Sequence, residues 1–86
     1  MPVISIFFGI IIRMYHGDHN PPHIHVQYGD DEAIIEIKSS KIWAGKLPNR
    51  VLKFVREWMK INRLILMKTW NDAQNHRTLK RIQPLE

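Results

Sequence analysis

Four histidines and one aspartate fall within ten residues of this chain, in the pattern His16-x-Asp18-His19-x-x-x-His23-x-His25. Alternation of polar and apolar residues around His23 and His25 predicts a strand. Residues i and i+2 of a strand point to the same side, with Cβ atoms roughly 7 Å apart. Two imidazoles placed in this way suit one shared metal ion. The candidate ligands of a divalent transition metal are Asp18, His19, His23, His25 and Glu36.

Three of these candidates come from outside the strand. Asp18 and His19 lie in the loop before it, where either would supply a third ligand. Glu36 lies across a predicted hairpin, where it would ligate the metal or orient an imidazole ring. Histidine with carboxylate ligation fits zinc, nickel, manganese or iron, and the spacing does not choose among them.

The same residues have two other interpretations. Imidazole titrates near neutral pH, so His19, His23 and His25 would also serve as catalytic acids and bases without a metal. With RNA as substrate they would suit cleavage that uses the 2′-hydroxyl. The structural alternative is that the histidines only occupy the polar side of a hairpin, and that Asp18 forms an Asx-turn into Pro21-Pro22.

Other catalytic signatures are missing from the sequence. There is no cysteine, which excludes thiolate zinc sites, cysteine nucleophiles and disulfides. There is also no phosphate-binding glycine loop, no G-x-S-x-G and no H-E-x-x-H. The histidine and aspartate cluster is therefore the main candidate for chemistry.

A second feature is a row of cations in the second half of the chain. The net charge is +5, and residues 46–86 carry ten Lys and Arg against three Asp and Glu. Helical spacing places several of them on one face, which would follow the phosphates of a nucleic acid or remain a solvated surface. The candidate nucleic-acid-binding residues are Arg50, Lys53, Arg56, Lys60 and Arg63.

The elements that must position these residues follow from hydrophobic periodicity. Period-two alternation predicts strands over residues 3–15, 23–29 and 32–39, with a short fourth strand over 41–44. Gly29-Asp30-Asp31 predicts a hairpin in one of two registers. A two-residue loop pairs Val26 with Ala33 and places His23 opposite Glu36, whereas a four-residue loop places His25 there.

Residues 48–75 are expected to be helical, starting at Pro48. One unbroken helix of that length would measure about 42 Å, so we expect a break near Asn62 unless a homodimer buries a long helix. The predicted fold is a single α+β domain over residues 1–86. It consists of an antiparallel meander of three or four strands followed by a C-terminal helical pair packed on one face.

The apolar segment Val3–Ile12 is expected to be a buried strand and not a targeting signal. Its first charge, Arg13, follows the apolar run instead of preceding it, and no small-residue cleavage site appears. About ten apolar residues are also too few to span a bilayer. We therefore expect a cytoplasmic protein with no membrane partner.

Several motifs together resemble the bacterial family catalogued as domain of unknown function 4160. They are Met1-Pro2-Val3-Ile4-Ser5, Phe8-Gly9-Ile10, Met14-Tyr15, Asp18-His19-x-Pro21-Pro22-His23-Ile24-His25, Tyr28-Gly29, Gly45-Lys46-Leu47-Pro48, Val55-x-Glu57-Trp58, Trp70 and Leu79-Lys80-x-Ile82-x-Pro84-Leu85. The resemblance implies a stand-alone bacterial protein whose gene often lies beside that of another small protein, as in a toxin–antitoxin pair. It therefore implies that neighbouring gene product as a cognate partner.

Two functions are expected on these grounds. The first is a small regulatory protein of toxin–antitoxin type that binds a partner protein or, through its basic helix, a nucleic acid. The second is a metal- or histidine-dependent enzyme, a ribonuclease in its most specific form, that uses Asp18, His19, His23 and His25.

Overall fold

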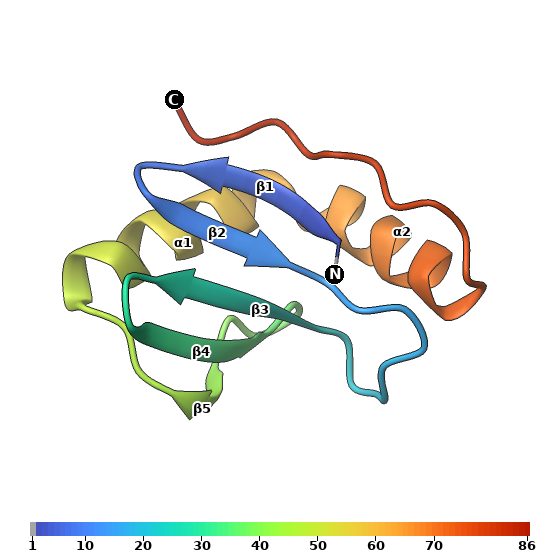
Figure 1. Ribbon diagram of the computed structural model, residues 1–86, viewed down its shortest axis with the longest axis horizontal. Coiled ribbons are helices and arrows are strands. Elements are labelled where there is room, and N and C mark those ends of the chain that lie inside the picture. The colour runs from blue at the N-terminus through green and yellow to red at the C-terminus, as the bar shows by residue number, and fades with distance from the viewer. Residues whose placement is uncertain (1) are drawn as a thin grey trace.

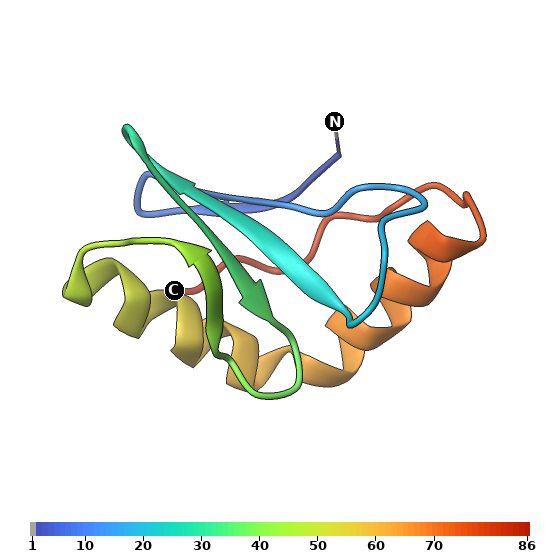
Figure 2. The ribbon, with the colours of Figure 1, turned by 90° about the horizontal axis from the view of Figure 1, so that it is seen from below.

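A computed structural model describes residues 2–86 as an antiparallel sheet followed by two helices. Within these residues the five strands are β1 (Val3–Phe7), β2 (Ile10–Arg13), β3 (His23–Tyr28), β4 (Asp31–Glu36) and β5 (Ile42–Gly45). They lie side by side in chain order, and helices α1 (Asn49–Ile61) and α2 (Arg63–Gln74) lie on one side of them (Figures 1 and 2). The predicted α+β meander with a C-terminal helical pair is confirmed, but the predicted number of strands was too low.

The additional strand arises because the segment predicted as one strand over 3–15 is itself a hairpin. Phe8 and Gly9 both have positive φ, 52° and 77°, as the two central residues of a tight hairpin turn require. The register also shifts between Val3 and Ser5, so the alternation changes side within β1. As a result Ile4 and Phe7 are buried, whereas Ile6 and Phe8 are exposed.

The hairpin of β3 and β4 positions the histidines. It has the two-residue turn, with Val26 paired to Ala33 and His23 paired to Glu36, which is the first of the two predicted registers. Ile24 and Val26 of β3 are buried toward the helices. Because side chains alternate along a strand, His25 faces the opposite, outer side of the sheet.

The helices cover the inner face and bend around it. Helix α1 buries Val51, Val55, Trp58 and Met59, and α2 buries Leu66, Thr69, Trp70 and Ala73. The predicted break occurs at Asn62, whose side-chain amide donates to the carbonyl of Trp58 at 2.9 Å. The carbonyl of Trp58 thus accepts from both the backbone N–H and the side-chain amide of Asn62. This insertion of a side chain into the helical hydrogen-bond pattern accounts for the kink. Neither helix within residues 2–86 is long and apolar enough to cross a membrane.

The segment after α2 packs back along the edge of the sheet. The N–H of Ile82 donates to the carbonyl of Ile4 at 2.7 Å, and the hydroxyl of Ser5 donates to the carbonyl of Ile82 at 3.0 Å. The indole N–H of Trp58 donates to the carbonyl of Gln83 at 2.8 Å. These bonds cover the outer edge of β1, which would otherwise expose unpaired backbone groups.

Candidate metal centre

The loop between β2 and β3 carries Asp18 to the first residues of β3. Helix α2 holds this loop in place. The Gln74 side-chain amide donates to the carbonyl of Asp18 at 2.6 Å, and the N–H of Gly17 donates to the carbonyl of Ala73 at 3.1 Å. The ring of His16 donates to the carbonyl of Arg77 at 2.6 Å. The position of Asp18 is therefore fixed by the end of α2 and the residues that follow it.

Asp18, His23 and His25 converge on one point. Oδ2 of Asp18 lies 2.8 Å from Nε2 of His23 and 3.3 Å from Nε2 of His25. One ligand atom from each of the three residues lies within 4.8 Å of the others. Two ligand atoms on a tetrahedral zinc ion are about 3.3 Å apart, so the cluster has the size of a first coordination sphere.

The ring of His23 is held at both nitrogens. Nδ1 lies 2.8 Å from the carbonyl oxygen of Pro21, and a carbonyl only accepts, so Nδ1 carries a proton. In the neutral ring Nε2 then has a lone pair, which points at the carboxylate of Asp18. Two electron-rich atoms at this distance need a cation between them, either a second proton on the ring or a metal ion.

Aromatic side chains enclose the two histidines. His23 is 2% exposed and has Trp43 and Trp70 on its flanks, each with a ring centroid 5.1 Å away. The ring of Tyr15 meets that of His25 edge-on at 4.4 Å. Both imidazoles therefore have fixed orientations, and the surroundings of His23 exclude water.

The carboxyl of Asp18 is held in its ionised form. Burial by itself would raise its pKa, but the hydrogen bond to His25, the backbone N–H of His19 and the bond and charge of His23 together hold the pKa below its ordinary value. An ionised carboxylate that faces two imidazole nitrogens is the form that binds a metal cation.

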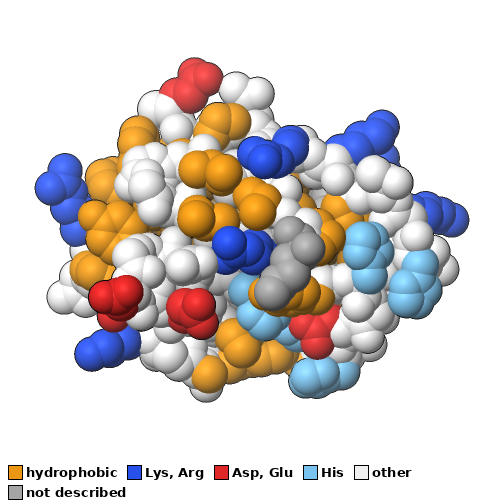
Figure 3. Space-filling view, viewed as in Figure 1, with side chains coloured by type: hydrophobic (Ala, Val, Ile, Leu, Met, Phe, Trp, Pro, Cys, Tyr) orange, Lys and Arg blue, Asp and Glu red, His pale blue; other side chains and the backbone are white. Residues whose placement is uncertain are grey.

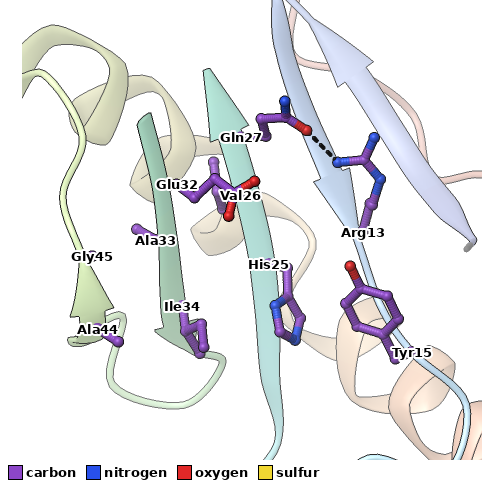
Figure 4. A pocket seen from close by; sticks show the side chains of 10 residues that line it. All are labelled: Arg13, Tyr15, His25, Val26, Gln27, Glu32, Ala33, Ile34, Ala44 and Gly45. Carbon is purple, nitrogen blue, oxygen red and sulfur yellow. Dashed lines mark hydrogen bonds between the residues drawn. The ribbon is translucent and has the colours of Figure 1, made fainter. Parts of the chain in front are cut away.

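A hollow on the outer face of the sheet adjoins the cluster at His25. It has a volume of about 210 Å³, and Figure 4 shows His25 and Tyr15 at one end and the linked pair Arg13 and Gln27 at the other. Arg13 donates to the side-chain oxygen of Gln27 at 2.6 Å. In the space-filling view of this side, histidine side chains gather toward one end of the molecule (Figure 3).

The structure does not bring the other two predicted ligands into the cluster. The ring of His19 is 87% exposed and contacts Oδ1 of Asp18 at 3.2 Å, on the far side of the carboxylate from the shared Oδ2. Glu36 pairs with His23 in the ladder, as in one of the two predicted registers, but its carboxylate accepts a hydrogen bond from Ser39. Asp18, His23 and His25 are thus the group that converges.

The predicted basic face is divided by its contacts. Arg56 donates to the carbonyl of Ser40 at 3.1 Å, and Arg63 donates to the carbonyl of Ile37 at 3.1 Å and to the hydroxyl of Ser40 at 3.0 Å. Arg50 lies over the ring of Phe54. These arginines support the loop after β4 and the surface of α1, whereas Lys53 and Lys60 are exposed.

Four residues that shape the site were not among the predicted site residues: Tyr15, Trp43, Trp70 and Gln74. Nothing local in the sequence places Trp43 and Trp70 against His23, since they come from β5 and α2. The pairing of β3 with β4, predicted correctly, gave no information on these longer-range contacts. Tyr15 is different, because its position could have been predicted. Continuing the alternation of β2 beyond Arg13 places Tyr15 on the same face of the sheet as Arg13.

Comparison with protein-family models gives a match over residues 9–71 to a family described as Domain of unknown function (DUF4160). The matched region contains the cluster, both tryptophans that flank His23, and all of α1. No curated protein and no solved structure matches the chain.

Proposed function

The chain belongs to the family described as Domain of unknown function (DUF4160), and we propose that it binds a divalent transition metal ion through Asp18, His23 and His25. Two imidazoles and one carboxylate form a ligand set that suits zinc, iron or nickel. The cluster contains no thiolate and little of the all-oxygen environment that calcium or magnesium prefers.

The observation that carries this proposal is the double anchoring of His23. Histidines that ligate metals commonly donate their other ring N–H to a backbone carbonyl, which fixes the tautomer and turns the second nitrogen toward the ion. His23 does this through Pro21, and its Nε2 faces Oδ2 of Asp18. A metal ion bound by both atoms removes the repulsion between them.

This arrangement also limits any metal-free acid–base role. Both nitrogens of His23 are engaged and its ring is buried, so no nitrogen remains to exchange a proton with a substrate. His25 is different, because its ring is partly exposed and lines the outer hollow. A metal-free acid–base mechanism would therefore use His25.

Three protein ligands leave at least one coordination position for water. A zinc ion held there would supply a water of lowered pKa, since zinc brings the pKa of its water to about 7. The hollow beside His25 would hold a substrate next to this ligand, with Arg13, which also donates to Gln27, facing an anionic group. Hydrolysis is therefore the reaction class proposed for this site, with ribonucleotide phosphodiesters as one candidate substrate.

The metal proposal is tested on protein purified without a polyhistidine tag. Titration with Zn²⁺ or Co²⁺ should saturate near one ion per chain, and bound Co²⁺ should show the visible absorption of a low-coordinate site. Asp18→Asn and His25→Ala should each weaken binding strongly. His19→Ala is the matched control, since its exposed ring lies outside the converging group, and should bind normally. Failure to bind either ion, or equal loss in all three variants, would rule out the centre.

A regulatory role in a toxin–antitoxin pair, expected from the family resemblance, is our second proposal. One observation favours binding to another protein: several large apolar side chains of the helices are exposed, including Ile61, Leu64 and Ile65. The test is expression of the chain alone and together with the neighbouring gene product. Growth arrest that the neighbour relieves would support a toxin, and a chain without effect on growth that does not co-purify with the neighbour would count against the pair.

A further inference from the structure

An exposed apolar row lies where the two helices meet, on the side away from the sheet. Ile61, Leu64 and Ile65 are 69, 87 and 51% exposed. Their spacing of three and four residues places them on one face, because the helical bonds continue through the junction. The N–H of Asn62 donates to Trp58 at 3.1 Å, and the N–H of Leu66 donates to Asn62 at 2.8 Å. We call these three side chains the junction row.

The junction row protrudes because of the kink. The two helices bend around the sheet with their convex side outward (Figure 2). The side chains that face the sheet, such as Trp58, Met59 and Leu66, are completely buried. The junction row occupies the opposite side of the same turns, so packing within this chain does not account for three large apolar residues there. Single exposed apolar residues are ordinary, whereas a continuous row marks an interaction surface.

A groove adjoins the junction row. It has a volume of about 280 Å³ and lies between the last turn of α1 and the segment that runs back along β1. Ile61 belongs to both the row and the groove, whose other walls include Trp58, Pro84 and Leu85. The groove therefore offers a place for one large apolar side chain of a partner, next to a row that would cover two or three more.

The charges around the row point to the chemistry of the partner. Lys60 precedes Ile61, and Lys68 lies one turn beyond Leu64 on the same face. Among residues 2–86 neither lysine takes part in an ion pair. Glu57, one turn before Ile61, is the one acidic residue of α1. Glu86 lines the far wall of the groove, where its carboxylate accepts a hydrogen bond from Gln83 at 3.1 Å. An apolar row with a cation at each end is complementary to a helix that carries an apolar stripe and acidic flanks.

We propose that the junction row and its groove bind an acidic amphipathic helical segment of another protein. This inference deepens the partner-binding role proposed above and is independent of the metal centre, because none of the residues of the junction row or its groove belongs to the group Asp18, His23 and His25. A second copy of this chain is less suitable, because pairing of two identical rows would bring the lysines of both copies together. A membrane surface is also less suitable, since Trp58 and Trp70 are buried and three side chains give little area for insertion.

The test uses two labelled synthetic helical peptides whose leucines recur at alternating spacings of three and four residues. One has glutamate at its remaining positions and the other has lysine, and binding to the full chain is followed by fluorescence anisotropy. The acidic peptide should bind at least about tenfold more tightly than the basic one, with an affinity that falls as salt rises. Equal binding of both peptides, or no binding of the acidic one, would overturn the proposal.

Variants locate the binding surface. Leu64→Gln and Ile61→Gln should abolish binding of the acidic peptide, and the double variant Lys60→Glu with Lys68→Glu should reverse the preference between peptides. All four positions are exposed, so these proteins should fold, which thermal melts would check. Ile6→Gln is the matched control, an exposed apolar residue on the other face, and should bind as the unchanged chain does.

Two further measurements test the other possible occupants of the junction row, a second copy of this chain and a membrane surface. Light scattering on the unchanged chain should show a monomer at the concentrations of the binding assay, and the chain should not sediment with vesicles of anionic phospholipid. A dimer that Leu64→Gln dissociates, or vesicle binding that Leu64→Gln abolishes, would assign the junction row to a second copy or to a membrane and would refute the acidic helix. The growth assay of the toxin–antitoxin pair does not use the peptides. Failure of the unchanged chain to bind the acidic peptide would therefore overturn the acidic-helix proposal without deciding the regulatory role.

Discussion

Oδ2 of Asp18 lies 2.8 Å from Nε2 of His23, on the side of the ring opposite the nitrogen that donates to Pro21. The contact joins a loop residue to the first residue of β3. The proposed metal ion would lie between these two atoms. The ionisation of Asp18 is therefore linked both to folding and to metal binding.

The first prediction concerns pH in the presence of a chelator. The pKa of Asp18 is lower in the folded chain than in the unfolded chain, so its ionised form stabilises the fold. This contribution is present in full above the ordinary aspartate pKa of about 3.9 and is lost as the pH falls through the lower folded value. Asp18→Asn should cost roughly 1.5–3 kcal/mol at neutral pH, the range for hydrogen bonds to a charged group.

The measurement is chemical denaturation of both proteins between pH 7 and pH 3. The difference between their free energies of unfolding should be constant down to about pH 5 and should shrink below pH 4. A difference that stays constant through the whole range, or a more stable Asp18→Asn, would contradict the assignment of Asp18 as the ionised centre of the cluster.

The second prediction concerns Gln74, whose side-chain amide donates to the backbone carbonyl of Asp18 at 2.6 Å and so holds the loop rather than a ligand atom. Gln74→Ala should release the loop and lower metal affinity by about 10–100-fold, as losses of outer partners commonly do. Asn75→Ala removes a comparable amide bond, to the carbonyl of Asn71, at the same end of α2. It serves as the control and should bind metal normally. Equal affinities for the two variants would show that the loop does not need its anchor.

These contacts indicate what the sequence could and could not reveal. Parity and a glycine turn, both of which are local signals, limited the pairing of β3 with β4 to two registers, and the structure has the one that pairs His23 with Glu36. The hairpin inside residues 3–15 could not be predicted in this way, because Phe8 is an unusual residue at positive φ and the alternation runs on through Gly9. Glu36 was placed correctly in the ladder, yet its side chain bonds Ser39, since a backbone register does not fix the direction of a flexible side chain. The flanking tryptophans depend on tertiary packing, on which the periodicity of one segment carries no information.

The third prediction compares two glycines with the same backbone handedness. Gly29 and Gly45 both have positive φ, 58° and 78°. A Cβ on Gly29 would meet nothing within 4 Å, whereas a Cβ on Gly45 would lie 1.9 Å from the carbonyl oxygen of Glu32. Gly29→Ala should therefore cost only the left-handed backbone penalty of about 1–2 kcal/mol.

Gly45→Ala should cost a further 1–3 kcal/mol or so, because β4 and β5 must move apart to admit the methyl group. Thermal or urea unfolding of both variants measures the difference. Since β5 carries Trp43 against His23, Gly45→Ala should also weaken metal binding, which Gly29→Ala should leave unchanged. Equal stabilities would mean that β5 can shift without cost and does not hold the flank of His23 firmly.

The fourth prediction separates the structural arginines from the exposed lysines of the predicted nucleic-acid-binding face. Arg63 makes two hydrogen bonds to the segment after β4, so Arg63→Ala should destabilise the fold by about 1–3 kcal/mol. Lys53→Ala and Lys60→Ala remove exposed side chains and should change stability by less than about 0.5 kcal/mol.

If this face binds nucleic acid, each of these two lysine substitutions should nevertheless reduce the affinity for single-stranded RNA. Each should also reduce the magnitude of the slope of log affinity against log salt by about 0.7. Anisotropy of a labelled RNA over a range of salt concentrations provides the measurement, with Lys80→Ala as the control on the segment beyond α2. A slope that neither lysine changes would assign the cations of α1 to solubility and to the support of the loop that Arg63 holds.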